Sequence, residues 1–168
     1  MTHPLPPGRD RQHLWQWSVL AVSSLAIAGV FAVLLILSKA PVTNEIVPWP
    51  EDFFQKGLIV HVALAFLVWI LSVFGALNVS VAANIGKLYQ QDKGQDFNGI
   101  AIFLSAVGTL AMLLPAFRNE SEPNLSNYVP VIIDPTYYWG LGLLGLGILV
   151  SVLCIFLKLE NIRNILAH

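Results

Sequence analysis

The residue best suited to chemistry in this sequence is a histidine inside a long apolar stretch. His61 is followed by Trp69 about two helical turns later. An ionisable side chain inside an apolar membrane helix points to function by default. A neutral imidazole can offer one ring nitrogen to haem iron while an acceptor holds its other N–H. The alternative is a histidine near the membrane interface that only hydrogen-bonds to a backbone carbonyl or to water.

Four apolar segments must position this histidine. Residues 17–38, 57–81, 99–117 and 137–157 contain no Asp, Glu, Lys or Arg. Charged residues make up 11% of the chain, against about 25% in soluble proteins. A hydrocarbon core about 30 Å thick needs roughly 20 apolar residues in a helix. The sequence therefore predicts an all-α integral membrane protein, a single transmembrane domain over residues 1–168 with four transmembrane helices.

The first apolar segment also resembles a secretory signal peptide, because Arg9 and Arg11 precede it. Its length exceeds that of a typical signal-peptide core, and it reaches Lys39 without a small-x-small cleavage pattern. We therefore expect a transmembrane helix here.

Charge predicts the orientation. Lys and Arg concentrate near the N-terminus, between the second and third segments, and at the C-terminus: Arg9, Arg11, Lys87, Lys93, Lys158 and Arg163. The other two loops carry acidic residues, with Arg118 and the boundary residues Lys39 and Lys56 as their basic residues. Their Pro and aromatic residues predict ordered lids. By the positive-inside rule, both termini are expected on the cytoplasmic side.

Several classes of function are excluded. A net charge of −1 offers no basic field for nucleic acid. The single Cys154 cannot form an internal disulfide. The sequence contains no metal-ligand cluster, phosphate-binding loop or paired nucleophile and base. No catalytic residue is assigned, and the chain is not expected to be catalytic alone.

Small residues and a proline shape the later segments. Pro115 predicts a kink or an end in the third helix. Four glycines crowd the fourth segment: Gly140, Gly142, Gly145 and Gly147. Small residues let helices approach closely. Helix packing is the favoured interpretation, although a flat cofactor would be served equally.

Two stretches of the sequence resemble the catalytic subunit of haem-copper oxidases, closest to the branch of cbb-type oxidases and nitric oxide reductases. PWPEDFFQKGLIVHVALAFLVWILSVFGAL (Pro48 to Leu77) is similar to the second transmembrane helix of that subunit. NLSNYVPVIIDPTYYWGLGLLGLGILV (Asn124 to Val150) is similar to the loop and fourth helix that follow.

This resemblance implies roles for two residues. His61 matches the axial ligand of a low-spin haem b, and Trp69 lies in the same cofactor-binding stretch. The metal would be the haem iron. The remaining ligands of the family lie in later helices that this sequence does not contain. The resemblance covers nearly all of the chain, but only the first third of the family's subunit.

The implied function is a split fragment of a respiratory terminal oxidase, similar to cytochrome c oxidase. A larger membrane subunit would supply the remaining helices, and the haem b would be shared with it. The donor, cytochrome c or quinol, stays open, as does the acceptor, oxygen or nitric oxide. A bacterial inner membrane is expected, alternatively the mitochondrial inner membrane. A haem-free accessory or assembly subunit, or an unrelated four-helix scaffold, also remains open.

Overall fold

The computed structural model describes residues 8–88, 97–126 and 129–166. Within these residues, four helical stretches are long and apolar enough to cross a membrane: Gly8–Lys39, Phe53–Gly86, Asn98–Phe117 and Pro135–Glu160. The all-α class and the four predicted helices are confirmed at that level. They indicate an integral membrane protein. Lys93, used above to predict orientation, lies outside the described residues.

The elements follow the predicted order with longer helices. They are α1 (Gly8–Lys39), α2 (Pro41–Ile46), α3 (Phe53–Val62), a π-helical segment (Ala63–Val68), α4 (Trp69–Leu88), α5 (Asn98–Leu113), a 3-10 turn (Leu114–Phe117), β1 (Glu122–Asn124), β2 (Val131–Ile133) and α6 (Pro135–Leu166). Helices extend past the charge-free segments because backbone hydrogen bonding continues through their polar end turns. Pro115 ends α5 as expected: regular α-helix stops at Leu113.

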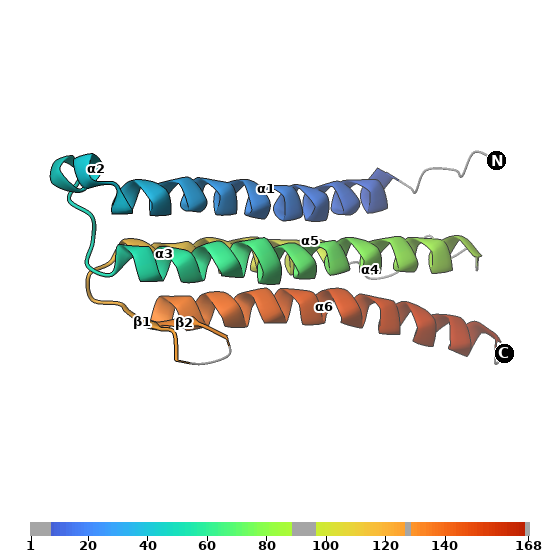
Figure 1. Ribbon diagram of the computed structural model, residues 1–168. Coiled ribbons are helices and arrows are strands. Elements are labelled where there is room, and N and C mark those ends of the chain that lie inside the picture. The colour runs from blue at the N-terminus through green and yellow to red at the C-terminus, as the bar shows by residue number, and fades with distance from the viewer. Residues whose placement is uncertain (1–7, 89–96, 127–128, 167–168) are drawn as a thin grey trace.

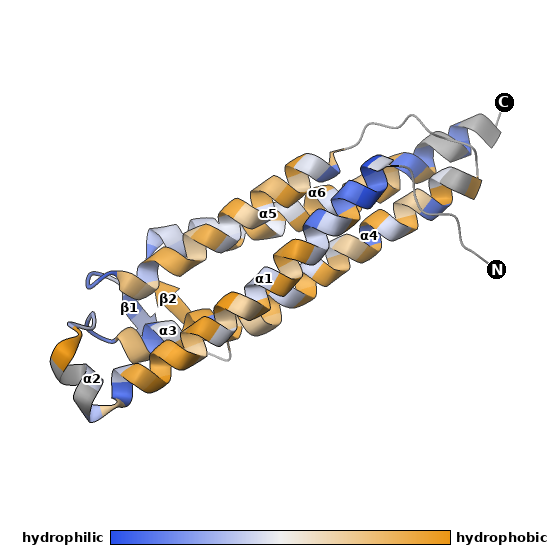
Figure 2. Ribbon diagram, turned by 90° about the horizontal axis from the view of Figure 1, so that it is seen from above, coloured by the Kyte–Doolittle hydropathy of each residue, from blue (hydrophilic) through white to orange (hydrophobic). Residues whose placement is uncertain are grey.

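The long helices lie side by side in an up-and-down bundle (Figure 1). α1 packs on α3 and α4, α4 packs on α6, and α6 packs most extensively on α5, whereas α1 and α5 meet only sparsely. Apolar residues run along the helices, and hydrophilic residues gather at the two ends (Figure 2). α1 begins and α6 ends at one end, here the terminal end, whereas α2 and the two strands mark the loop end.

Glycines allow the backbones of α5 and α6 to approach each other closely. A Cβ atom on Gly108 would lie 2.6 Å from the carbonyl oxygen of Gly140, and one on Gly147 would lie 2.5 Å from that of Ala101. Gly142 and Gly145 have no neighbour within 4 Å of an added Cβ. The predicted close packing is therefore confirmed for Gly140 and Gly147, while the other two glycines do not contact the rest of the described chain in this way.

The loop end is ordered by polar contacts between distant segments. β1 and β2 pair antiparallel, with Pro123 opposite Ile132. The Lys56 side chain is fully buried, and its Nζ donates a hydrogen bond to the carbonyl oxygen of Arg118 at 2.6 Å. Arg118 in turn lies 3.6 Å from the Asp134 carboxylate. These contacts connect α3, the 3-10 turn and α6.

Candidate functional site

His61 sits in the last turn of α3, against the backbone of α1. Its Nδ1 lies 2.8 Å from the carbonyl oxygen of Ala28. The ring is partly buried, and Ala28 itself is 2% exposed. The α1–α3 contact is close beside it, because Gly57, one turn earlier on α3, faces the Leu35 and Phe31 side chains. The histidine is thus held by a residue 33 positions away in the sequence.

This hydrogen bond selects the tautomer of the imidazole. A carbonyl oxygen can only accept, so Nδ1 of His61 must carry the proton. In the neutral ring the lone pair then lies on Nε2. Histidines that ligate metals commonly donate their other N–H to a backbone carbonyl, which fixes the ring and raises its basicity. In its neutral form His61 is therefore the tautomer that could offer Nε2 to a metal.

The π-helical segment sets which residues share a side with His61. Val60, Leu64, Val68 and Ser72 are all buried at four-residue spacing. In an ideal α-helix such positions drift by about 40° per step. A π-helical segment forms i→i+5 hydrogen bonds and takes more residues per turn, which removes part of this drift.

The π-helical segment reduces the angular drift in the same way for the positions one residue further along, which include His61 and Trp69. His61 and Trp69 therefore stay on one side of the continuous helix, two turns apart. Trp69 is 38% exposed. The two predicted site residues therefore lie on the same flank, but two turns apart along the helix, which is too far for Trp69 to support the His61 ring.

His61 lies at the edge of the α1–α3 contact, on the side of α3 away from the strands and α6. Ile59 lines a pocket beside the strands and α6, and His61 is two residues, or about 200°, further round α3. On α1, Ile27 lines a groove towards α5, and Gly29 is likewise about 200° further round. Gly29 is exposed, with nothing within 4 Å of an added Cβ. This side of α1 therefore has open space at Gly29 within the described part of the chain.

Other metal chemistry finds no support in the described residues. Among residues 8–88, 97–126 and 129–166, no group of three or more His, Cys, Asp or Glu side chains could hold a metal ion. A haem requires only one protein ligand from this chain if the second comes from another, and His61 could supply that one.

Sequence reasoning treated Lys56 only as a boundary residue and missed its burial. Its signal in the sequence is weak: a single Lys at the edge of an apolar segment, five residues before His61. A buried ammonium needs an acceptor, and the Arg118 carbonyl provides one. Lys56 therefore anchors the loop end of the helix that carries the histidine.

Comparison with known proteins gives relatives without an assigned activity. An uncharacterized protein of Rickettsia prowazekii is 23% identical over 173 residues, covering 89% of this chain and 33% of the relative. An uncharacterized protein of Aquifex aeolicus is 28% identical over 140 residues, covering 82% of this chain and 32% of the relative. No family model and no solved structure matches. The chain spans about a third of the length of the curated relatives it matches.

Proposed function

We propose that this protein is a membrane subunit of a respiratory haem-copper oxidase, in which His61 is one axial ligand of a low-spin haem b. A separate, larger membrane subunit would carry the second axial ligand and the oxygen-reducing centre. When bound, such a haem supplies one-electron transfer between a donor, cytochrome c or quinol, and that centre.

The observation that carries the proposal is the hydrogen bond from His61 Nδ1 to the Ala28 carbonyl oxygen. It orients the ring and leaves Nε2 as the free lone pair within a transmembrane helix. A histidine without a ligand role would make the same hydrogen bond to a backbone carbonyl. The unshared lone pair on Nε2, within a transmembrane helix, is what favours a ligand role.

The relatives are longer than this chain. About two thirds of each relative has no counterpart in this chain. A haem between His61 and a second histidine on another chain would cover the open flank of α1 and α3. The residues described here would then position one ligand, exclude water from one side of the ring and leave the other side to the partner.

The proposed location is a bacterial inner membrane or the mitochondrial inner membrane, with both termini in the cytoplasm or matrix. Support comes from the four apolar helices and from the even number of crossings, which leaves the start of α1 and the end of α6 at the same end. The excess of basic residues at that end matches the positive-inside rule.

The test is a reduced-minus-oxidised absorption spectrum of the complex purified through a tag on this chain, with mass spectrometry of every co-purified subunit. His61→Ala is expected to remove a b-type band while the subunits still co-purify. His13→Ala is the matched control, since His13 is also a buried histidine but lies near the start of α1; it should keep the band.

A third variant gives a specific electronic readout. His61→Met is expected to retain haem with a raised reduction potential, because a thioether ligand favours the reduced iron. A b-type spectrum unchanged by His61→Ala would refute the ligand role. A wild-type complex without haem but with oxidase subunits would indicate a haem-free accessory subunit, and neither haem nor such partners would indicate a four-helix scaffold.

A further inference from the structure

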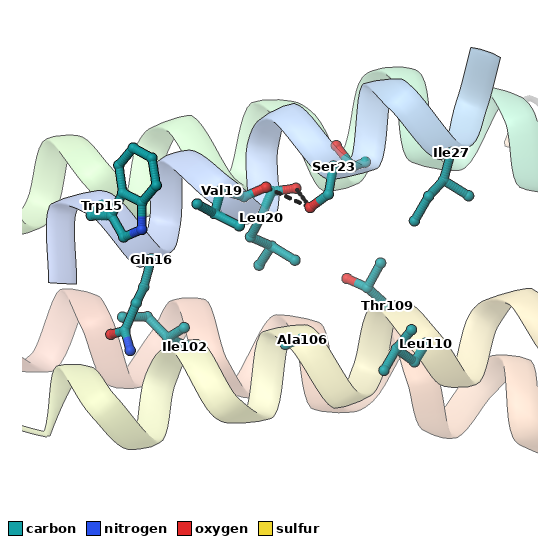
Figure 3. A pocket seen from close by; sticks show the side chains of 11 residues that line it. Trp15, Gln16, Val19, Leu20, Ser23, Ile27, Ile102, Ala106, Thr109 and Leu110 are labelled. Carbon is teal, nitrogen blue, oxygen red and sulfur yellow. Dashed lines mark hydrogen bonds between the residues drawn. The ribbon is translucent and has the colours of Figure 1, made fainter. Parts of the chain in front are cut away.

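The sparse contact between α1 and α5 leaves a groove on the terminal half of the bundle. It has a volume of about 460 Å³. Figure 3 shows side chains of the two helices facing each other across it. The walls include Val19, Ser23 and Ile27 of α1 and Ile102, Ala106 and Leu110 of α5. The groove lies on the side of α1 opposite Gly29, so it is separate from the flank that carries His61.

The walls of the groove favour an apolar occupant. The hydroxyl groups along it are already bonded within their own helices: Ser24 Oγ donates to the Ala21 carbonyl at 2.8 Å, and Thr109 Oγ1 donates to the Ser105 carbonyl at the same distance. Ser23 Oγ likewise donates to the Val19 carbonyl. A hydrocarbon chain in the groove would leave none of these three groups without a partner.

The length of the groove distinguishes a lipid chain from a helix. From Trp15 to Ile27, α1 rises about 18 Å. This is close to the hydrocarbon thickness of one leaflet, about 15 Å. A transmembrane helix would need a contact surface along the whole core of about 30 Å. The groove ends near the middle of the bundle, where an acyl chain from one leaflet would also end.

A polar residue lines the terminal end of the groove, and basic residues lie beyond it on α1. Gln16 lines the groove at that end, and Arg9 lies seven residues earlier, two turns away on the same face of α1. Arg9 and Arg11 flank a single Asp10, so this turn has a net positive charge. Trp15 is 69% exposed at the same level, as expected for an interface anchor. A guanidinium pairs well with a phosphodiester.

We propose that the α1–α5 groove binds an anionic phospholipid, with one acyl chain between the two helices and its phosphate at Arg9. The site is independent of haem binding at His61. It would seal the loosely closed edge of the bundle on the leaflet next to the terminal end.

The experiment uses the full chain, with its co-purified partners, in vesicles of equal parts phosphatidylcholine and phosphatidylglycerol. One lipid at a time carries a photoreactive diazirine in its acyl chain, and labelled peptides are mapped by mass spectrometry. Labelling by the phosphatidylglycerol probe is expected to concentrate on the groove side of α1 and α5 and to exceed that by the phosphatidylcholine probe.

Variants test the acyl-chain groove and the phosphate position at Arg9 separately. Ala106→Phe and Ser23→Leu fill the groove from opposite walls and should each abolish the excess labelling there, whereas Ala26→Phe, at an exposed α1 position outside the groove, should not. Arg9→Gln should keep labelling of the groove but remove the preference for phosphatidylglycerol. Circular dichroism confirms that each variant is folded.

Three results would overturn the proposal: labelling spread evenly around the helices, excess labelling that survives both groove-filling variants, or a groove occupied in the purified complex by a protein segment that excludes both probes. A complex that lacks haem but retains the groove labelling would refute the proposed function and leave this site standing.

Discussion

Replacing Gly108 by alanine tests how far backbone contact holds α5 and α6 together. The added Cβ would lie 2.6 Å from the Gly140 carbonyl oxygen and 2.7 Å from the Leu144 backbone nitrogen. Ordinary contact begins near 3.4 Å, so the two helices must separate by about 0.8 Å. Neither obstructing atom belongs to a flexible side chain. The whole interface has to move.

The cost of this movement follows from overpacking. Extra methyl groups in well-packed interiors destabilise by about 1–3 kcal/mol, and a glycine replaced by alanine in a helix recovers up to about 1 kcal/mol of propensity. Gly142→Ala is the matched control, since its added Cβ meets nothing within 4 Å. We expect Gly108→Ala to be less stable than Gly142→Ala by about 2 kcal/mol, or roughly thirtyfold in the unfolding equilibrium.

The assay is unfolding of the two variants in mixed micelles by titration with a denaturing detergent, followed by circular dichroism. Equal free energies of unfolding for Gly108→Ala and Gly142→Ala would refute the reasoning, because they would mean that α5 and α6 are not in backbone contact. A second pair strengthens the comparison: Gly140→Ala should behave like Gly108→Ala, and Gly145→Ala like Gly142→Ala.

Two further substitutions test other contacts of the bundle by thermal unfolding. Gly75→Ala places a Cβ 2.6 Å from the fully buried Trp17 ring, so we expect a loss of about 1–3 kcal/mol together with a changed tryptophan fluorescence; an unchanged spectrum would contradict the contact. Asp134→Ala removes the carboxylate that accepts a hydrogen bond from the Thr136 N–H at 2.7 Å and should cost about 1 kcal/mol, whereas Asp134→Asn keeps the acceptor and should recover most of it.

The four helices were predictable because lipid imposes simple requirements on sequence. A segment that spans the hydrocarbon must be apolar and must satisfy its own backbone hydrogen bonds, so charge-free stretches and helices coincide. The end of α5 was predictable for another reason, since Pro115 disrupts a regular α-helix, which stops at Leu113. The lipid requirements do not predict which helices touch, because most apolar side chains are equally compatible with lipid and with a neighbouring helix.

The candidate site was predictable only in part for the same reason. His61 stands out as an ionisable residue in an apolar segment, but its partner is the backbone of Ala28, and backbone groups carry no signal in sequence. The π-helical segment Ala63–Val68 could not be predicted from the sequence either, since its residues also occur in ordinary α-helices. The burial of Lys56 was not predictable from its place at a segment boundary, because it depends on a hydrogen bond to the Arg118 carbonyl, which follows the 3-10 turn.

Some glycines of the bundle are in backbone contact with a neighbouring helix and others have open space beside them, and this difference limits where a flat cofactor could lie. Between α5 and α6 the glycines bring backbone onto backbone, so Gly108 and Gly140 leave no space for a ring. On α1, Gly29 has open space beside it, next to the residue whose carbonyl holds His61. A haem ligated by His61 would therefore lie on the outer flank of α1 and α3, exposed to lipid on its second face. Because lipid offers no axial ligand, the proposed haem would need a second chain on that flank, so a test of the proposed cofactor is also a test of the proposed partner.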